Sequence, residues 1–232
     1  KLDEKWCKSE NGFSIYIRPF LFASQSCIKA SSSEEYTFII ILSPTKEYYT
    51  DPINLVIEQE YSRAASGGVG FAKAAGNYGA SFFPTNLAKK KGFTQVIWTD
   101  SNTHEYIEES GTMNIWFIID NILVTPALSD SILGGITRDS IMKIAKDLGY
   151  QVQEREVSVN EILEAHKSGM LDESFGTGTA VSVLPISSIT YKDIKINFQN
   201  SNLISSKLKD KLLSIQKGLL KDNYGWIDCL NY

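Results

Sequence analysis

Apolar residues gather in short runs rich in aromatic and β-branched side chains over the first part of this 232-residue chain. Residues 13–22 and 36–42 are two such runs, and a serine-rich segment lies between them. The pattern predicts two neighbouring strands. The longest apolar run, residues 38–42, predicts a buried strand and is far too short to cross a bilayer. No membrane span is therefore expected.

A spacing of three and four residues between apolar positions predicts helices later in the chain. One helix is expected over residues 136–148, with Gly149 as its cap. Ser158 and Glu161 form a capping-box pattern ahead of a second helix, which Gly169 ends. The apolar stripes are Ile141, Ile144, Ala145 and Leu148 in the first of these helices, and Leu208, Leu212, Ile215 and Leu219 in a C-terminal one.

The remaining runs predict further strands and their connections. Residues 113–119 and 121–125 flank a predicted hairpin turn at Asp120 and Asn121, and a basic turn before Gly92 marks a helix end. Residues 93–100 and 179–191 also have the composition of strands. Because no internal repeat or low-complexity linker interrupts the chain, the sequence predicts one α+β or α/β unit.

Composition excludes several kinds of function. With 43% apolar residues, 22% charged residues and a net charge of -4, the chain is an ordinary globular protein that gives no reason to expect nucleic acid as a partner. Its three cysteines stand far apart without a C-x-x-C pair, so we expect a reducing cytoplasm and no disulfide framework. Two histidines offer little for a metal site, and none is predicted.

One lysine lies in an unusual environment. Residues 67–81, GGVGFAKAAGNYGAS, place Lys73 among five glycines and four alanines with no acidic residue. A lysine becomes a nucleophile when it loses its proton, and small neighbours let a flat cofactor approach the backbone. Lys73 is therefore a candidate for a Schiff base with pyridoxal phosphate, although a solvated loop lysine fits the same residues.

Pyridoxal phosphate needs an acid at its ring nitrogen, donors for its phosphate and a partner for its phenolic oxygen. Glu109, just before a predicted strand, is the candidate acid, whereas Glu108 fits a solvated acidic loop. The glycines that lead into the helix at 136 predict an anion site at its first amides. Thr177 and Thr179 offer a second anion nest, and Tyr78 could reach the phenolic oxygen or belong to the core.

Several ordered segments carry a resemblance to a known family. YIRPFLFAS, GGVGFAKAAGNYGAS, QVIWTD, IEESGTMNIW, LVTPALSDSILGGITRDSI, Glu154-Arg155 and FGTGTAVSVLP resemble the branched-chain amino acid aminotransferases in order and spacing. These are fold-type IV pyridoxal phosphate enzymes. The resemblance implies an α+β large domain over residues 1–232, a mixed β pseudo-barrel surrounded by helices, with the family's N-terminal small domain absent.

Carried over residue by residue, the resemblance implies a cofactor site. Lys73 would form the internal aldimine and move a proton between Cα and the cofactor's C4′. Glu109 would lie at the pyridine nitrogen and Tyr78 at the phenolic oxygen. The phosphate would be bound by the backbone amides of Ile136 and Thr137 together with Thr179.

The resemblance also implies substrate residues. Tyr16 and Arg18 would border the substrate site, where the Arg18 guanidinium could take the carboxylate of glutamate with two hydrogen bonds; a structural ion pair is the alternative. Thr112, Thr179 and Ala180 would lie near the ring and the substrate α-carboxylate. Some animal members have a redox-sensitive C-x-x-C after the GTA motif, but this chain has VSVL there, so no thiol switch is expected.

The implied reaction is a ping-pong transfer of the amino group from leucine, isoleucine or valine to 2-oxoglutarate, in a cytoplasmic homodimer. Two alternatives stay open. The chain could be another fold-type IV enzyme, such as a D-amino acid aminotransferase or an aminodeoxychorismate lyase, although YIRP with GTMN favours the branched-chain group. It could also be a non-catalytic remnant that keeps the fold.

Overall fold

The computed structural model describes residue 6 and residues 13–46, 51–198 and 203–228. The chain divides into two compact units, Lys1–Thr50 and Asp51–Tyr232, and each is described here by itself. Among the described residues, none of the helices has the length and apolar character needed to cross a membrane.

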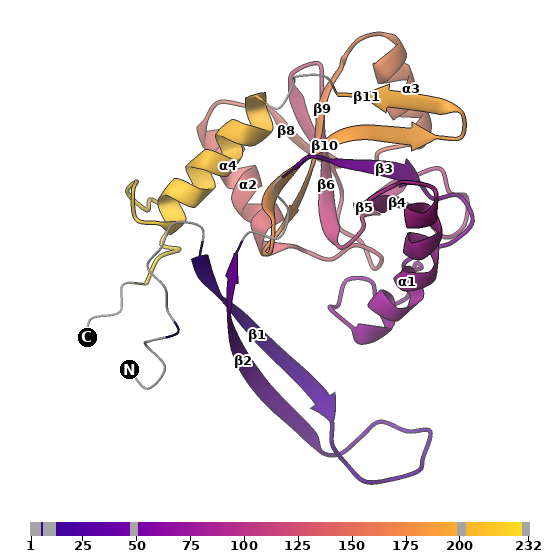
Figure 1. The fold of residues 1–232 in the computed structure, drawn as a ribbon, viewed down its shortest axis with the longest axis vertical. Helices are drawn as coiled ribbons and strands as arrows, with labels where there is room; N and C mark the ends of the chain where they lie inside the picture. The colour runs from indigo at the N-terminus through magenta and orange to yellow at the C-terminus, as the bar shows by residue number, and fades with distance from the viewer. Residues whose placement is uncertain (1–5, 7–12, 47–50, 199–202, 229–232) are drawn as a thin grey trace. The chain divides into compact units, whose positions relative to one another are not determined.

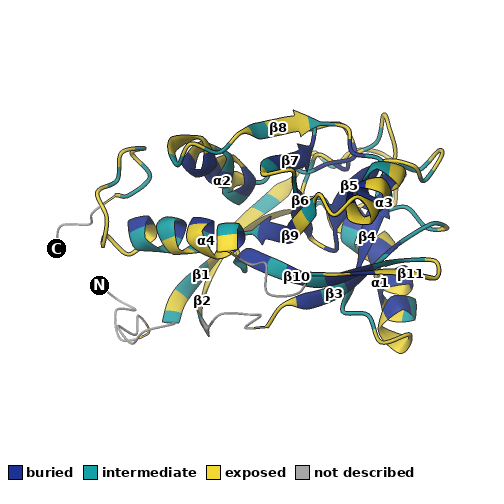
Figure 2. Ribbon diagram, turned by 90° about the horizontal axis from the view of Figure 1, so that it is seen from above, coloured by how far each residue is buried: buried dark blue, intermediate teal, exposed yellow. Residues whose placement is uncertain are grey.

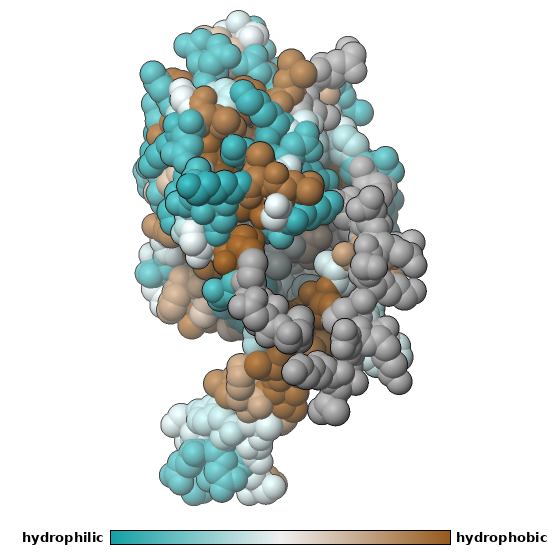
Figure 3. Space-filling model, turned by 90° about the vertical axis from the view of Figure 1, so that its left-hand side faces the viewer, coloured by the Kyte–Doolittle hydropathy of each residue, from teal (hydrophilic) through white to brown (hydrophobic). Residues whose placement is uncertain are grey.

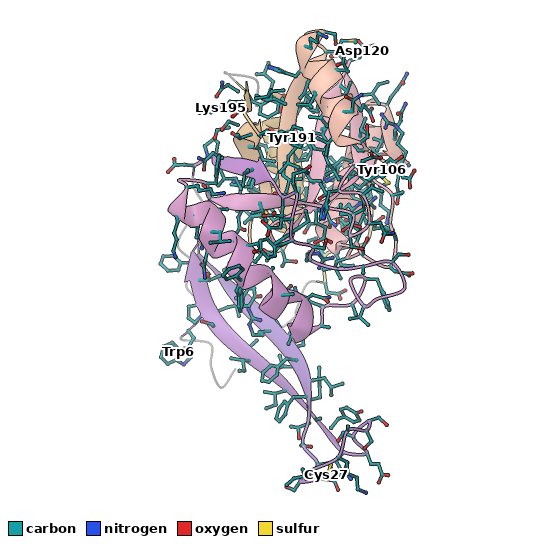
Figure 4. All side chains as sticks on the ribbon, turned by 90° about the vertical axis from the view of Figure 1, so that its right-hand side faces the viewer. Trp6, Cys27, Tyr106, Asp120, Tyr191 and Lys195 are labelled. Carbon is teal, nitrogen blue, oxygen red and sulfur yellow. The ribbon has the colours of Figure 1, made fainter. Side chains whose placement is uncertain are left out.

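The first unit is a two-stranded antiparallel hairpin of β1 (Phe13–Ala23) and β2 (Tyr36–Lys46), paired without a break from Phe13 opposite Lys46 to Ala23 opposite Tyr36. The prediction of two neighbouring strands is confirmed. The prediction that residues 38–42 are buried is wrong, because their exposed fractions run from 37% to 61%. A two-stranded sheet has no second layer of its own to cover either face. Figure 3 shows apolar side chains along these strands, and Cys27 lies exposed in their connecting loop (Figure 4).

The second unit is built on a nine-stranded mixed sheet (Figure 1). Six of the strands close into a ring, because each of β3, β4, β5, β6, β9 and β10 pairs with the next and β10 pairs with β3. The strands are β3 (Ile53–Ile57), β4 (Gln95–Thr99), β5 (Ile107–Ser110), β6 (Met113–Ile119), β7 (Ile122–Pro126), β8 (Val152–Arg155), β9 (Leu171–Gly178), β10 (Ser182–Tyr191) and β11 (Ile194–Asn197).

Within the described part of the chain, four helices surround this barrel: α1 (Ala75–Lys90), α2 (Ile136–Asp147), α3 (Val159–Lys167) and α4 (Leu203–Gln216). Helices α2 and α4 pack together against β9 and β10, and α1 packs against β4 (Figure 1). Figure 2 shows that α2 and α4 each bury one face and expose the other. Most residues of the predicted stripes form these buried faces: Ile141, Ile144, Ala145, Leu208, Leu212 and Ile215 join Trp116 and Phe175 in one core cluster, and Leu148 packs against it. The prediction is wrong for Leu219, which has an exposed fraction of 73% because α4 ends before it, at Gln216.

Local signals in the sequence are confirmed at several element ends. Asp120 and Asn121 have φ values of 50° and 60°, which suits the tight hairpin turn between β6 and β7, where Asp120 is labelled in Figure 4. Ser158 caps α3 by accepting a hydrogen bond from the Glu161 amide at 3.0 Å. Gly149, with φ of 83°, follows α2. The predicted α+β pseudo-barrel with surrounding helices is thus the architecture of the second unit.

Candidate active site

One hollow in the second unit brings together residues that are far apart in the sequence. Four of the predicted site residues line it: Lys73, Tyr78, Glu109 and Thr112. Their segments are the glycine-rich loop, the first turns of α1, strand β5 and the turn that follows β5. The other lining residues are Arg63, Ala72, Asn77, Ser81, Gly111 and Leu133.

Glu109 forms the buried wall of this hollow. It lies within β5 and not just before a strand, and its exposed fraction is 3%. One carboxylate oxygen, Oε1, accepts a hydrogen bond from the Leu133 amide at 2.7 Å. The other, Oε2, lies 3.2 Å from Nε of Arg63 in an ion pair. Glu109 also lies in register with residues of the next two strands: it pairs with Asn114 on β6, and Asn114 pairs with Thr177 on β9.

The environment of Glu109 shifts its acidity. Burial raises the pKa of Glu109 to about 7, although the Arg63 charge and the Leu133 N–H both lower it and Glu108 raises it a little further. The desolvation of a carboxylate in this position therefore outweighs its two favourable partners. A carboxyl group that titrates near neutrality is typical of functional sites, where a positively charged ligand atom can complete the ion pair.

Lys73 and Tyr78 come from the loop that enters α1. Lys73 is exposed and immediately precedes the N-cap residue Ala74. Asn77 fixes this loop, because its buried side-chain amide donates to the carbonyls of Val69 at 2.9 Å and Ala72 at 3.0 Å. These two hydrogen bonds tie the loop to the start of α1, and Lys73 lies in the tied segment, at the hollow.

The N-terminus of α2 is a suitable anion site, although Ile136 and Thr137 do not line the hollow. Gly135 is the N-cap residue of α2, and no side chain of the described residues caps this helix. Asn114 holds the approach to the helix by donating to the Leu133 carbonyl at 2.7 Å. A side chain at Gly135 would collide with Asn114, since its Cβ would lie 2.1 Å from Oδ1. Free first-turn amides with a favourable dipole are what a phosphate needs.

Thr179 and Ala180 lie in the exposed turn between β9 and β10. Just before this turn, Thr177 on β9 pairs with Asn114 on β6. Asn114 is the residue whose side chain holds the segment that leads into α2. Thr177 is buried, and its hydroxyl accepts a hydrogen bond from the Trp116 indole at 3.1 Å. Its side chain therefore packs in the sheet, and Thr179 is left as the exposed threonine of the expected nest.

Tyr16 and Arg18 belong to the hairpin unit. They are two residues apart on β1 and so share one face. The Arg18 guanidinium donates to the Tyr16 hydroxyl at 3.0 Å and lies 5.0 Å from the centre of its ring. The pair has no acidic partner in these contacts. Their role at a substrate site stays a prediction.

Sequence reasoning missed two features of the site. It did not select Arg63, which carries no motif and is recognised only through its contact with Glu109. It also placed Glu108 in a solvated loop, and this is wrong, because Glu108 lies in β5 with an exposed fraction of 8% and accepts a hydrogen bond from Ser131. The segment around Ser131 lies over the Glu108 side chain, and the local composition does not reveal this cover.

Comparisons with known proteins identify relatives across the chain. Residues 2–189 match the family described as Amino-transferase class IV. The chain is 43% identical over 230 residues to branched-chain-amino-acid aminotransferase 2 of Bacillus subtilis, covering 97% of this chain and 63% of that protein. It is 46% identical to a probable branched-chain-amino-acid aminotransferase of Staphylococcus epidermidis, covering 97% and 64%. The chain thus spans less than two thirds of the length of these relatives.

Solved structures give the same answer for the fold. The branched-chain amino acid aminotransferase of Escherichia coli superposes with a TM-score of 0.78 at 28% identity, covering 94% of this chain and 70% of that one. Another branched-chain amino acid aminotransferase, solved with pyridoxamine 5'-phosphate, has a TM-score of 0.78 at 25% identity, covering 91% and 68%. The expected fold-type IV architecture is confirmed. With a family match over most of its length, the chain belongs to the class IV amino-transferases.

Proposed function

We propose that the chain carries the cofactor-binding part of a branched-chain amino acid aminotransferase that uses pyridoxal 5'-phosphate. The observation that carries this proposal is one hollow in which Lys73, Tyr78 and the buried Glu109 meet. The relatives and the solved structures named above support the reaction class and the cofactor.

The residues present fit the cofactor. Glu109 supplies a buried carboxyl for a ring nitrogen, and Tyr78 supplies a hydroxyl at the same hollow. The uncapped amides of Ile136 and Thr137, together with Thr179 from the neighbouring turn, supply the donors that a phosphate needs. Bound pyridoxal 5'-phosphate would supply an aldehyde that carries the amino group and a ring that takes up the electrons released at the substrate carbon.

Within this proposal each side chain has a defined task. Lys73 would supply the amine that holds the cofactor through its aldehyde group, and its Nζ, once free, would move the proton at the substrate Cα. Glu109, when ionised, would pair with the ring nitrogen and keep it protonated. Tyr78 would donate its hydroxyl hydrogen to the phenolic oxygen and so help to orient the ring.

The substrate side of the proposal follows from the family resemblance. Thr112 lies at the rim of the hollow and would face the α-carboxylate, as would Thr179 and Ala180. Arg18 would bind the distal carboxylate of glutamate through its planar guanidinium, with Tyr16 holding it in place. The proposed reaction takes the amino group from leucine, isoleucine or valine and gives it to 2-oxoglutarate, releasing glutamate and the branched 2-oxo acid.

Covalent labelling tests the cofactor part of this proposal. The purified chain is mixed with pyridoxal 5'-phosphate, reduced with borohydride and digested, and the labelled peptide is identified by mass spectrometry. We expect the label on Lys73. Lys73→Arg should abolish it, whereas Lys89→Arg, at an exposed lysine in the last turn of α1, should leave it unchanged. Label spread evenly over surface lysines would contradict the proposal.

Product analysis tests the substrate class. Turnover with L-leucine and 2-oxoglutarate that gives L-glutamate supports the branched-chain reaction. Products of D configuration, or cleavage of aminodeoxychorismate, would assign the chain to another fold-type IV activity. Label on Lys73 without any turnover would indicate a cofactor-binding remnant.

Three further proposals rest on the family resemblance: residues 1–232 act as one large domain, the protein assembles as a homodimer, and it works in the cytoplasm. Sedimentation velocity of the purified chain tests the second. A single species at twice the mass of 25.9 kDa is expected, and a monomer at all concentrations would contradict it.

A further inference from the structure

Arg63 occupies the centre of the candidate site without any assigned role. Its side chain is only 9% exposed. The guanidinium reaches three groups: Oε2 of Glu109 at 3.2 Å, the Gly70 carbonyl at 3.1 Å, and the Ser131 carbonyl, to which it also donates a hydrogen bond. A fully charged group buried to this extent needs such partners, because an arginine cannot lose its proton to avoid the cost of desolvation.

The three contacts join three different walls of the hollow. Glu109 belongs to β5, Gly70 to the loop that presents Lys73, and Ser131 to the segment that leads into α2. The last two pack very closely, because a Cβ on Gly70 would lie 2.5 Å from Cα of Ser131. The Phe71 amide also donates to the Asp130 carbonyl at 2.9 Å. Arg63 supplies the donors for the carbonyls that this close approach buries.

The contact with Glu109 is electrostatic. Nε of Arg63 lies within ion-pair distance, but it makes no hydrogen bond among the described residues, so its charge and not a directed bond acts on the carboxylate. The other charged groups nearby are Glu108, which disfavours ionisation of Glu109, and Lys73, which lines the same hollow. Arg63 is thus the buried cation that offsets part of the desolvation of this carboxylate.

We propose that Arg63 is a positioning residue that favours the ionised form of Glu109 and fixes the lysine-bearing loop against the entry to α2. The proposal deepens the function proposed above and rests on it for its catalytic meaning. The first half of the proposal concerns the positive charge beside Glu109, which a lysine could also supply. The second half concerns the hydrogen bonds to the Gly70 and Ser131 carbonyls. A lysine could not make these as well, because a single ammonium cannot reach three separated oxygens with the geometry of a guanidinium.

The charge half is tested without any cofactor, from the pH dependence of unfolding. Glu109 has a folded pKa of about 7 and an ordinary value of 4.5, so its ionisation costs stability between these values and nothing further above pH 7. Arg63→Met removes the cation and raises the folded pKa above 7. The folding equilibrium of this variant should therefore keep falling between pH 7 and pH 9, by up to roughly tenfold per pH unit, relative to the unmodified chain.

Three companion variants make this test specific. Arg63→Lys keeps a cation and should cancel most of the extra slope. Glu109→Gln added to Arg63→Met should remove most of it, because the carboxyl paired with Arg63 is gone and only the weaker effect of the Arg63 charge on Glu108 remains. Arg138→Met is the matched control: its side chain is 4% exposed, but its carboxylate partner Glu154 is 37% exposed, so no extra slope is expected. If the extra slope persists undiminished in the double variant, or is absent from Arg63→Met, the proposal is wrong. Arg63→Gln replaces Arg63→Met if the latter does not fold.

The positioning half is tested with pyridoxal 5'-phosphate. Arg63→Lys should retain the Glu109 charge but lower the rate of covalent labelling at Lys73 at least tenfold, because the loop loses its ties to Gly70 and Ser131. Labelling at the unmodified rate would overturn this half. If the unmodified chain itself does not label at Lys73, the proposed function fails, while the pH measurement still decides the charge half.

Discussion

Strand β5 contributes consecutive acidic residues, Glu108 and Glu109, to two hollows, and the two hollows differ in the charged side chains that line them. Glu109 faces the hollow that Arg63 and Lys73 also line. Glu108, on the opposite face, belongs to a hollow lined by Asp100, Asp130 and hydroxyl side chains, and none of the described residues that line it is a lysine or arginine. Both carboxyls are buried. The difference shows that the partners of a buried acid, and not its burial, decide what it can do.

The partners act on the acidity of the two groups in different ways. Burial raises the pKa of Glu108, and the hydrogen bond from Ser131 is the largest influence that lowers it. Its second oxygen, Oε2, is buried and has no hydrogen-bond partner among the described residues. Glu109 has a partner for each oxygen, one of them a cation. Only the second arrangement is suited to hold a positively charged ring nitrogen.

The largest expected effect comes from removing the nucleophile on the Glu109 side. Lys73→Ala should lower turnover on the order of 10⁴-fold or more, because the covalent attachment and the proton transfer depend on the same amine. The measurement is steady-state formation of glutamate from leucine and 2-oxoglutarate. Lys91→Ala, at the end of α1, serves as the control and should keep turnover within about twofold. Comparable losses in both variants would remove Lys73 from its proposed role.

Substitution of the two neighbouring acids should change turnover to very different extents. Glu109→Gln keeps the shape of the side chain but cannot carry a negative charge, so we expect turnover to fall about 10²-fold. Glu108→Gln, at the adjacent position, should change turnover less than about threefold, since it faces the other hollow. Parallel kinetics on both variants check this. Equal losses would mean that the two hollows are not functionally distinct.

This contrast also marks how far the sequence could predict the site. The alternation of a strand implies that Glu108 and Glu109 face opposite sides, but nothing in the local pattern shows that both sides are covered. The sequence predicted Lys73, Tyr78, Glu109 and Thr112 as site residues, and the four do line one hollow. Arg63 could not be predicted, because its contacts with Glu109 and Ser131 lie 46 and 68 residues away along the chain.

The fold was predictable where local rules decide it. The helix stripes, the turn at Asp120 and Asn121 and the cap at Ser158 follow from short-range chemistry. The exposure of residues 38–42 was not predictable, since an apolar run does not reveal whether a second layer covers it. Closure of the barrel through β9 and β10 is likewise a long-range property.

A smaller effect on stability is expected from Glu108, which makes no ion pair among the described residues. The raised pKa of Glu108 means that its ionisation costs stability, and the cost grows as the pH rises above its ordinary value of 4.5. Glu108→Gln removes this cost. Its melting temperature relative to the unmodified chain should therefore be higher at pH 8 than at pH 5, by a few degrees. Thermal unfolding followed by circular dichroism checks the sign, and a difference independent of pH would contradict it.

The smallest effect should come from Ser131, the residue that serves both hollows. Its carbonyl accepts from Arg63 on one side, and its hydroxyl donates to Glu108 on the other. Ser131→Ala removes only the hydroxyl, so Glu109 should be unaffected while the pKa of Glu108 rises further. We expect a loss of about 1 kcal/mol at pH 8 and a smaller one at pH 5, because the lost hydrogen bond favours the ionised carboxylate.

Two variants decide whether this effect acts through Glu108. Ser129→Ala is the control, since the Ser129 hydroxyl contacts Ser131 at 3.0 Å and makes no bond to Glu108. It should show no such pH dependence. In a Glu108→Gln background, Ser131→Ala should also lose its pH dependence, because the titrating group is gone. If the loss at pH 8 persists there, Ser131 stabilises the segment before α2 by itself, and the two hollows are coupled through the backbone and not through the acid.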